Sequence, residues 1–190
     1  MKNKYIYRSV LSEAEFKKVI KCFSMDINVS KSAMFTSISR NIIERIFIAL
    51  RKRVVALCEQ ESPLIGTAAA DPGKEHSVFG VVWCDGKVYT LSAGDSVIQN
   101  RSHAEIHFGN KQCRLYHLHE HSALITDIEE FWRRIYRRFL KFHAMDVNKF
   151  IMHLKECEYR FNHRDDDLYP VLLNLCEAQP LFAPEYNMKT

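Results

Sequence analysis

The chain has 190 residues, of which 47% are hydrophobic, and 27 Lys and Arg against 23 Asp and Glu give it a net charge of +4. Such a composition is typical of a globular protein with a sizeable core. No apolar run approaches the ~18 residues of a membrane span, and no charged start with an apolar segment marks export, so we expect a cytoplasmic protein with no membrane partner. Its six cysteines form no Cys-x-x-Cys pair, which argues against a zinc ribbon or a disulfide framework and favours reduced, mostly buried thiols.

Charge is distributed unevenly along the sequence. Residues 1–60 hold twelve Lys and Arg against five Asp and Glu, and residues 131–164 hold nine against three, whereas residues 61–130 hold five against ten. Two basic segments around an acidic one fit a protein that binds phosphates at two places and keeps carboxylates for metal between them. Ordinary helical surfaces that happen to be basic are the alternative.

Three helices are predicted within the first 60 residues. Ser12 and Glu15 have the spacing of a capping box and predict a helix over 12–24. A short second helix is expected near 31–38, and Ser39 is expected to cap a longer third helix. The exposed face of this third helix is predicted to carry five basic residues, Arg40, Arg45, Arg51, Lys52 and Arg53. Three helices with a basic last member fit a helix-turn-helix, whose later helix enters the major groove, and a three-helix cluster without DNA is the alternative.

The periodicity changes after residues 61–66, where we place a domain boundary. Strand-like runs over 78–84 and 87–91 are joined by Asp85-Gly86, a strong signal for a two-residue hairpin turn. Further strands are expected over 96–99 and 112–121. The middle of the chain is therefore predicted to form a sheet.

Two amphipathic helices in a row are predicted between Thr126 and Arg164. Thr126 and Glu129 have capping-box spacing, and Asp146 is a plausible cap for the second helix. The apolar stripe of the pair consists of Ile128, Phe131, Trp132, Ile135, Phe139, Phe142, Phe150, Ile151, Leu154, Cys157 and Phe161. The opposite face of the first helix is cationic and is a candidate DNA-binding surface, made of Arg133, Arg134, Arg137, Arg138 and Lys141.

The same segment resembles a known family. The motifs I-E-x-F-W at 128–132, K-F at 141–142 and H-L-K-E-C-E-x-R-F-N-x-R at 153–164 are similar to the C-terminal signature of small bacterial insertion-sequence transposases with an ISXO-two-like DDE domain. The resemblance covers most of residues 10–175 and is strongest after Ile125. It implies an α+β or α/β fold, with an N-terminal helix-turn-helix over 1–60, a shortened ribonuclease-H-like mixed sheet with C-terminal helices over 66–178, and a tail over 179–190.

The resemblance also implies an activity. Transposases of this kind bind the terminal inverted repeats of their element as double-stranded DNA, and they cleave and transfer strands with two Mg²⁺ or Mn²⁺ ions; we further expect a homodimer. Asp71 stands at the place of the first catalytic aspartate and Glu129 at the third acidic position, which makes them the implied catalytic residues and metal ligands. The second aspartate falls on Arg101, beside Asn100, and a guanidinium cannot ligate a metal ion. Impaired catalysis is therefore expected, and the alternative is a catalytically dead, transposase-derived DNA-binding protein or regulator.

Three smaller features complete the sequence. His117, His119 and His121 alternate as in a strand, which we interpret as a surface patch rather than a transition-metal site. Tyr136 stands where the family has a lysine that positions DNA. The three adjacent aspartates at 165–167 cannot all face one ion, and a solvated turn is the better interpretation.

Overall fold

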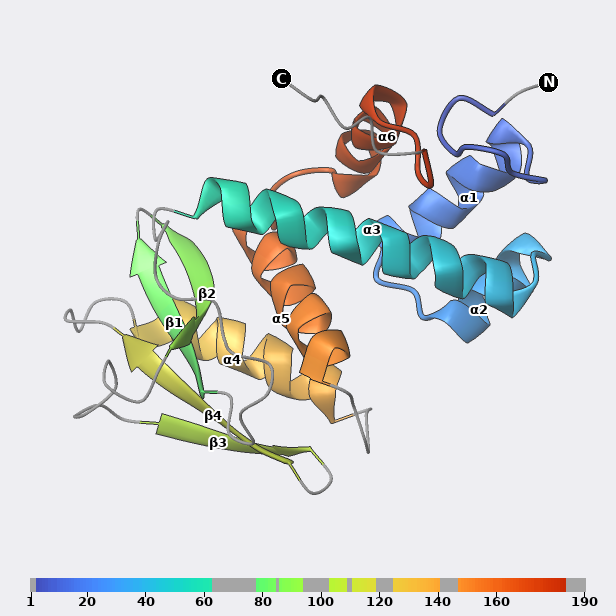
Figure 1. Ribbon diagram of the computed structural model, residues 1–190. Coiled ribbons are helices and arrows are strands. Elements are labelled where there is room, and N and C mark those ends of the chain that lie inside the picture. The colour runs from blue at the N-terminus through green and yellow to red at the C-terminus, as the bar shows by residue number, and fades with distance from the viewer. Residues whose placement is uncertain are drawn as a thin grey trace. The chain divides into compact units, whose positions relative to one another are not determined.

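A computed structural model of the chain describes residues 3–62, 78–84, 86–93, 103–108, 111–118, 125–140 and 147–183. Its contacts divide the protein into two units. The first unit combines Met1–Arg53 with Asp165–Thr190, and the second is Val54–Arg164. Figure 1 shows the elements of both units.

Four helices contribute to the first unit. They are α1 (Glu13–Ser24), α2 (Val29–Thr36), the part of α3 (Arg40–Glu61) up to Arg53, and α6 (Leu168–Ala178). The capping box predicted for α1 is confirmed, since the Ser12 hydroxyl accepts the Glu15 N–H at 3.2 Å and the Glu15 carboxylate accepts the Ser12 N–H at 2.8 Å. Asn28 caps α2 by accepting the N–H of Lys31 at 2.9 Å. Local side-chain chemistry therefore fixes where the first two helices begin.

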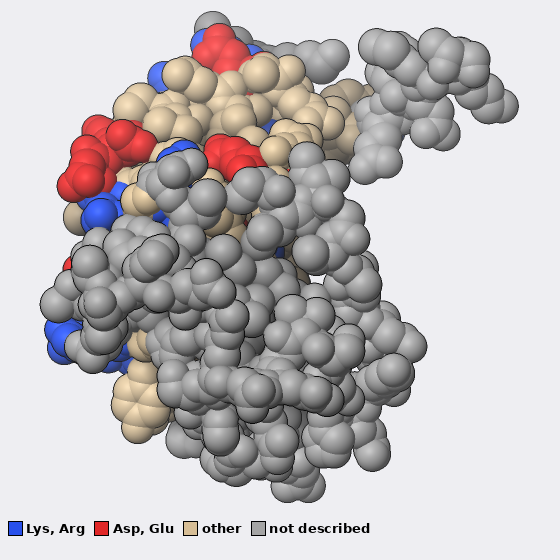
Figure 2. Space-filling view, turned by 90° about the vertical axis from the view of Figure 1, so that its left-hand side faces the viewer, with Lys and Arg blue, Asp and Glu red and all other residues tan. Residues whose placement is uncertain are grey.

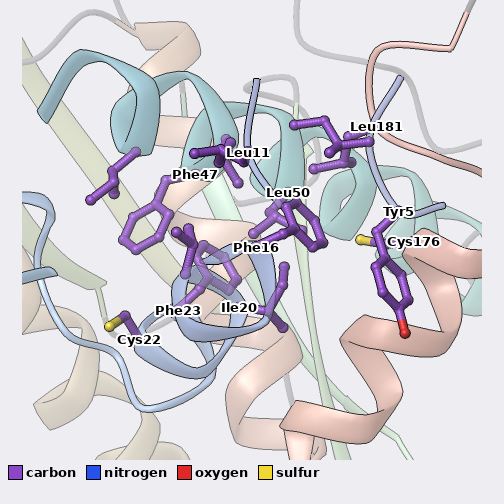
Figure 3. Packing of buried hydrophobic residues seen from close by; sticks show 14 of the residues in the cluster. Tyr5, Leu11, Phe16, Ile20, Cys22, Phe23, Phe47, Leu50, Cys176 and Leu181 are labelled. Atoms are coloured by element: carbon purple, nitrogen blue, oxygen red, sulfur yellow. The ribbon is translucent and has the colours of Figure 1, made fainter. Parts of the chain in front are cut away.

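The core of the first unit is rich in aromatic rings (Figure 3). Phe16 is fully buried and stacks on Tyr5 with ring centroids 5.7 Å apart. Phe23 meets Phe47 of α3 edge to face at 5.0 Å. Such offset and edge-to-face pairs add stabilisation beyond the area that they bury. Phe16 and Phe23 of α1 therefore lie in this core, and Phe23 packs against α3.

Segments near the two ends of the chain meet in this unit. Leu181 is buried, its N–H donates to the carbonyl of Tyr5 at 2.9 Å, and its carbonyl accepts the N–H of Tyr7 at 2.8 Å. Cys176 of α6 is also buried in this core. The predicted domains, 66–178 and a tail over 179–190, therefore differ from the units that the contacts define. The reason is that apolar side chains of α6 and Leu181 pack with those of the N-terminal helices. The three aspartates at 165–167 form an exposed turn, as expected, and Asp167 caps α6.

The second unit contains a four-stranded mixed sheet. Its strands are β1 (Val78–Cys84), β2 (Lys87–Ala93), β3 (His103–Phe108) and β4 (Lys111–Leu118), in the order β2-β1-β4-β3. β1 runs antiparallel to β2 and parallel to β4, and β3 runs antiparallel to β4. The predicted hairpin is confirmed, with Gly86 in its turn at φ +77°, a backbone conformation that favours glycine.

Helices α4 (Ile125–Phe139) and α5 (Val147–Asn162) pack on this sheet (Figure 1). The shared core joins Val81 of β1 and Val88 of β2 to the apolar side chains of the two helices, which include Phe131, Ile135, Phe139, Phe150, Leu154, Cys157 and Phe161. The stripe predicted for α4 and α5 is therefore confirmed for the residues whose side chains are described.

Other predictions about this unit fare differently. α4 begins at Ile125, so Thr126 lies inside its first turn and not at its cap. β3 is a strand that the sequence pattern does not predict, and the strand expected over 96–99 falls outside the described residues. The helical content and the mixed sheet agree with the expected class, while the helix-turn-helix and the ribonuclease-H-like topology stay predictions. No described helix is long and apolar enough to span a membrane.

Candidate nucleic-acid interface

The five basic residues predicted on α3 fall into two groups. Arg40, Arg45 and Lys52 are exposed. The Arg45 guanidinium lies 5.6 Å from the ring centroid of Phe182, which is itself partly exposed. These three cations remain accessible to a polyanion.

The other two are occupied within the unit. The guanidinium of Arg51 lies 5.8 Å from the ring centroids of both Phe23 and Phe47. Arg53 donates from Nη1 to the carbonyls of Leu175, at 3.0 Å, and Gln179, at 2.5 Å. Carbonyls at a helix C-terminus lack partners within the helix and carry partial negative charge, so a cation there stabilises the helix end. Arg53 therefore holds the C-terminal end of α6 against α3.

The connection between α2 and α3 is short. Only residues 37–39 separate the two helices, and Ser37 adopts a left-handed conformation with φ 58° and ψ 22°. The apolar side chains that follow, Ile38, Ile43 and Ile46, are buried. Asn41 and Glu44 are exposed in the first turns of α3, next to Arg40 and Arg45. α2 and α3 are therefore joined by a tight turn, and the start of α3 presents a polar surface.

On α4, the predicted cationic face also divides. Arg133 and Arg137 are exposed, and so are Tyr136 and Leu140 between and beyond them. Arg134 donates from Nη2 to Glu130 Oε1 at 2.6 Å. This ion pair lowers the pKa of Glu130, through the hydrogen bond first and the charge of Arg134 second. Lys141 lies outside the described residues.

Arg138 has a different role from its neighbours on α4. Its Nη2 lies 2.5 Å from Glu156 Oε2, and only 14% of the Arg138 side chain and 1% of the Glu156 side chain are exposed. Arg160 approaches the other oxygen of Glu156 at 2.9 Å. A buried carboxylate requires such partners, because an uncompensated charge in the interior is costly. Arg138 therefore joins α4 to α5 and is not available on the surface as Arg133 is.

A second buried carboxylate joins α5 to the sheet. Glu158 Oε2 accepts the Thr90 N–H at 2.7 Å, accepts the Thr90 hydroxyl, and lies 2.8 Å from Lys155 Nζ. Lys155 Nζ also donates to the carbonyl of Thr90 at 2.5 Å. Burial raises the pKa of Glu158, although Lys155 and the Thr90 donors oppose the effect. Both backbone polar groups of Thr90 thus bond to side chains of α5.

Asn162 likewise bonds to both backbone polar groups of one β2 residue, Val88, which lies two positions before Thr90. Its side-chain amide donates to the Val88 carbonyl at 2.8 Å, and its side-chain oxygen accepts the Val88 N–H at 2.7 Å. β2 is an edge strand, and its N–H and C=O groups on the open side are a template for pairing with another strand. Lys155, Glu158 and Asn162 cover this edge. These three polar residues of the H-L-K-E-C-E-x-R-F-N motif therefore stabilise the fold by binding the backbone of β2.

The catalytic pair implied by the resemblance is Asp71 and Glu129. Asp71 lies outside the described residues, and only the backbone of Glu129 is described, in the second turn of α4. Within the described part of the chain, no group of three His, Cys, Asp or Glu residues could hold a metal ion. Of the three histidines, His117 lies on β4, while His119 and His121 are outside the described residues. The Mg²⁺ or Mn²⁺ site stays a prediction from the resemblance.

The described surface carries charge of both signs. Figure 2 shows Lys and Arg next to Asp and Glu over the described part of one face. A polyanion would therefore meet individual basic helix faces and not a field of one sign.

Comparison of the chain with protein-family models, with curated proteins and with solved structures finds no match in any of the three.

Proposed function

We propose that the chain is a transposase-derived protein that binds double-stranded DNA through α2 and α3. The observation that carries the proposal is the tight α2–α3 connection, with left-handed Ser37, followed by a helix start with Arg40, Asn41 and Arg45 on its surface. The resemblance to insertion-sequence transposases supplies the expected target, which is the terminal inverted repeats of a mobile element.

The surface of α3 has the chemistry that such binding needs. In a helix-turn-helix, residues near the start of the second helix reach base edges in the major groove. Arg pairs with guanine and Asn with adenine through two hydrogen bonds each, so Arg40, Asn41 and Arg45 are suited to read bases. Lys52, farther along the helix, is suited to a phosphate, which adds affinity without sequence preference.

Fluorescence anisotropy of a labelled duplex, titrated with the full chain at several salt concentrations, tests the proposal. Each phosphate contact that is lost should reduce the slope of log K against log salt by about one unit. Lys52→Ala should therefore weaken binding and flatten the slope. Lys18→Ala, which removes an exposed lysine from α1, is the matched control and should leave the slope unchanged. Equal slopes for Lys52→Ala and the wild type would contradict the assignment of Lys52 to the interface.

Strand cleavage is the second candidate function. It is supported by the I-E-x-F-W motif, which places Glu129 near the start of a helix that follows the sheet, as the resemblance implies. Incubation of a duplex carrying the presumed terminal repeat with Mg²⁺ or Mn²⁺ tests it, with Glu129→Ala beside the wild type. Metal-dependent nicking that Glu129→Ala abolishes would favour an active enzyme, and binding without nicking would favour the catalytically dead alternative.

A further inference from the structure

The outer surface of α4 carries two exposed apolar side chains. Tyr136 is 57% exposed and Leu140 is 58% exposed. Arg133, Tyr136, Arg137 and Leu140 follow the spacing i, i+3, i+4 and i+7, which places them on one side of a helix. We refer to these four residues as the α4 stripe.

The stripe is separate from the core of its unit. The side of α4 that packs carries Phe131, Ile135 and Phe139, all of them buried. Tyr136 and Leu140 therefore contribute little to folding, and a substitution at either position should leave the unit stable.

The charges around Tyr136 restrict what can bind there. Arg133 lies about one helical turn before Tyr136, Arg137 directly follows it, and both arginines are exposed. The nearby carboxylate of Glu130 is neutralised by Arg134, 2.6 Å away. An occupant must therefore combine negative charge with a flat apolar face.

Single-stranded DNA has both properties. Its phosphates can pair with the two guanidinium groups, and an unpaired base can stack on the phenol ring of Tyr136, a combination that single-strand binding proteins use repeatedly. A duplex has its base faces already stacked on one another, so it offers no free base face to the phenol ring. An anionic membrane requires a wide apolar helix face, and the wide apolar face of α4 is already buried in the core.

We propose that the α4 stripe binds single-stranded DNA, with a base stacked on Tyr136 and the phosphates on either side paired with Arg133 and Arg137. The inference rests on the proposed function in that DNA is the ligand, and it adds a second surface for a strand that has separated from its partner. Such a strand is available wherever a duplex end frays.

Anisotropy titrations of the full chain with a labelled oligo-dT of about 15 nucleotides test the inference. Tyr136→Ala should weaken binding roughly 5- to 150-fold, the range expected for one stacked base, while Tyr136→Phe should keep wild-type affinity because the ring remains. Melting temperatures of the two variants equal to that of the wild type would show that both are folded.

The controls separate this inference from the proposed duplex binding. Tyr136→Ala should leave duplex affinity within about twofold, whereas Lys52→Ala should weaken duplex binding and leave the effect of Tyr136→Ala on oligo-dT unchanged. Equal oligo-dT affinity for Tyr136→Ala and the wild type would overturn the inference even if duplex binding is intact. Tighter binding of oligo-rU, or a Tyr136-dependent association with phosphatidylserine vesicles stronger than that with oligo-dT, would also overturn it.

Discussion

Asn162→Ala should destabilise the second unit by exposing the edge of β2. The substitution removes two hydrogen bonds, of 2.7 and 2.8 Å, and leaves the N–H and C=O of fully buried Val88 without the partner that each now has. An unsatisfied buried polar group costs roughly 1–3 kcal/mol, and Asn162 is half-buried so that water can replace part of the loss. We expect a decrease of about 2–4 kcal/mol in the free energy of unfolding.

Urea unfolding followed by tryptophan fluorescence measures this change, because both tryptophans, Trp83 and Trp132, belong to the second unit. Asn174→Ala, at an exposed position of α6, is the matched control and should change stability by less than about 0.5 kcal/mol. Native-state hydrogen exchange adds a local readout, since the Val88 amide should exchange faster in Asn162→Ala. An Asn162→Ala protein as stable as the control, with unchanged exchange at Val88, would refute the reasoning.

Three further perturbations follow from the same structure. Burial raises the pKa of Glu158 above its ordinary value of 4.5, so the free energy of unfolding should fall as pH rises from 4.5 through the raised value. Glu158→Gln should flatten this dependence in urea titrations at several pH values, and a steeper dependence in the variant would contradict the reasoning. Arg138→Ala, which leaves buried Glu156 with fewer partners, should cost about 3 kcal/mol by urea unfolding, whereas loss of the exposed pair in Arg134→Ala should cost less than about 0.5 kcal/mol. Ser37→Gly relieves a left-handed conformation at φ 58° and should stabilise the first unit by about 0.5–1 kcal/mol in thermal unfolding followed by circular dichroism, and a lower melting temperature would argue against the turn geometry.

Elements set by local chemistry could be predicted from the sequence. The Ser12 and Glu15 side chains bond to backbone only three residues away, so their spacing alone identifies the start of α1. Gly86 occupies a turn that only its two flanking strands determine. The apolar faces of α4 and α5 that pack in the core depend on helical periodicity within one segment, and their buried residues follow it.

Features that depend on distant segments escaped the sequence analysis. Lys155, Glu158 and Asn162 form hydrogen bonds with Thr90 and Val88, more than sixty residues away, and nothing local in the sequence identifies these two partners. A signal was nevertheless present: these three residues recur at i, i+3 and i+7 beside the apolar stripe of α5, as a polar row would if it faced other backbone. The contacts group α6 with the N-terminal helices, which the sequence does not predict for a similar reason, since an apolar helix does not indicate which core it joins.

The candidate interface could be predicted in part. Charge alone identified all the basic residues of α3 and α4, but it could not separate exposed Arg45 and Arg133 from Arg53 and Arg138, whose partners lie on other helices. Tyr136 was recognised only as a departure from the family lysine. Its exposure next to two arginines is what makes it informative.

The most direct test of DNA recognition by α3 is selection of bound duplexes from a randomised pool by the full chain. The account predicts enrichment of a defined site, and it predicts that Asn41→Ala relaxes the preference at one adenine position while Lys52→Ala leaves the site unchanged and weakens binding to all sequences alike. A pool that remains random after selection, or a site that Asn41→Ala, Arg40→Ala and Arg45→Ala all leave unaltered, would contradict the assignment of α3 as the recognition helix.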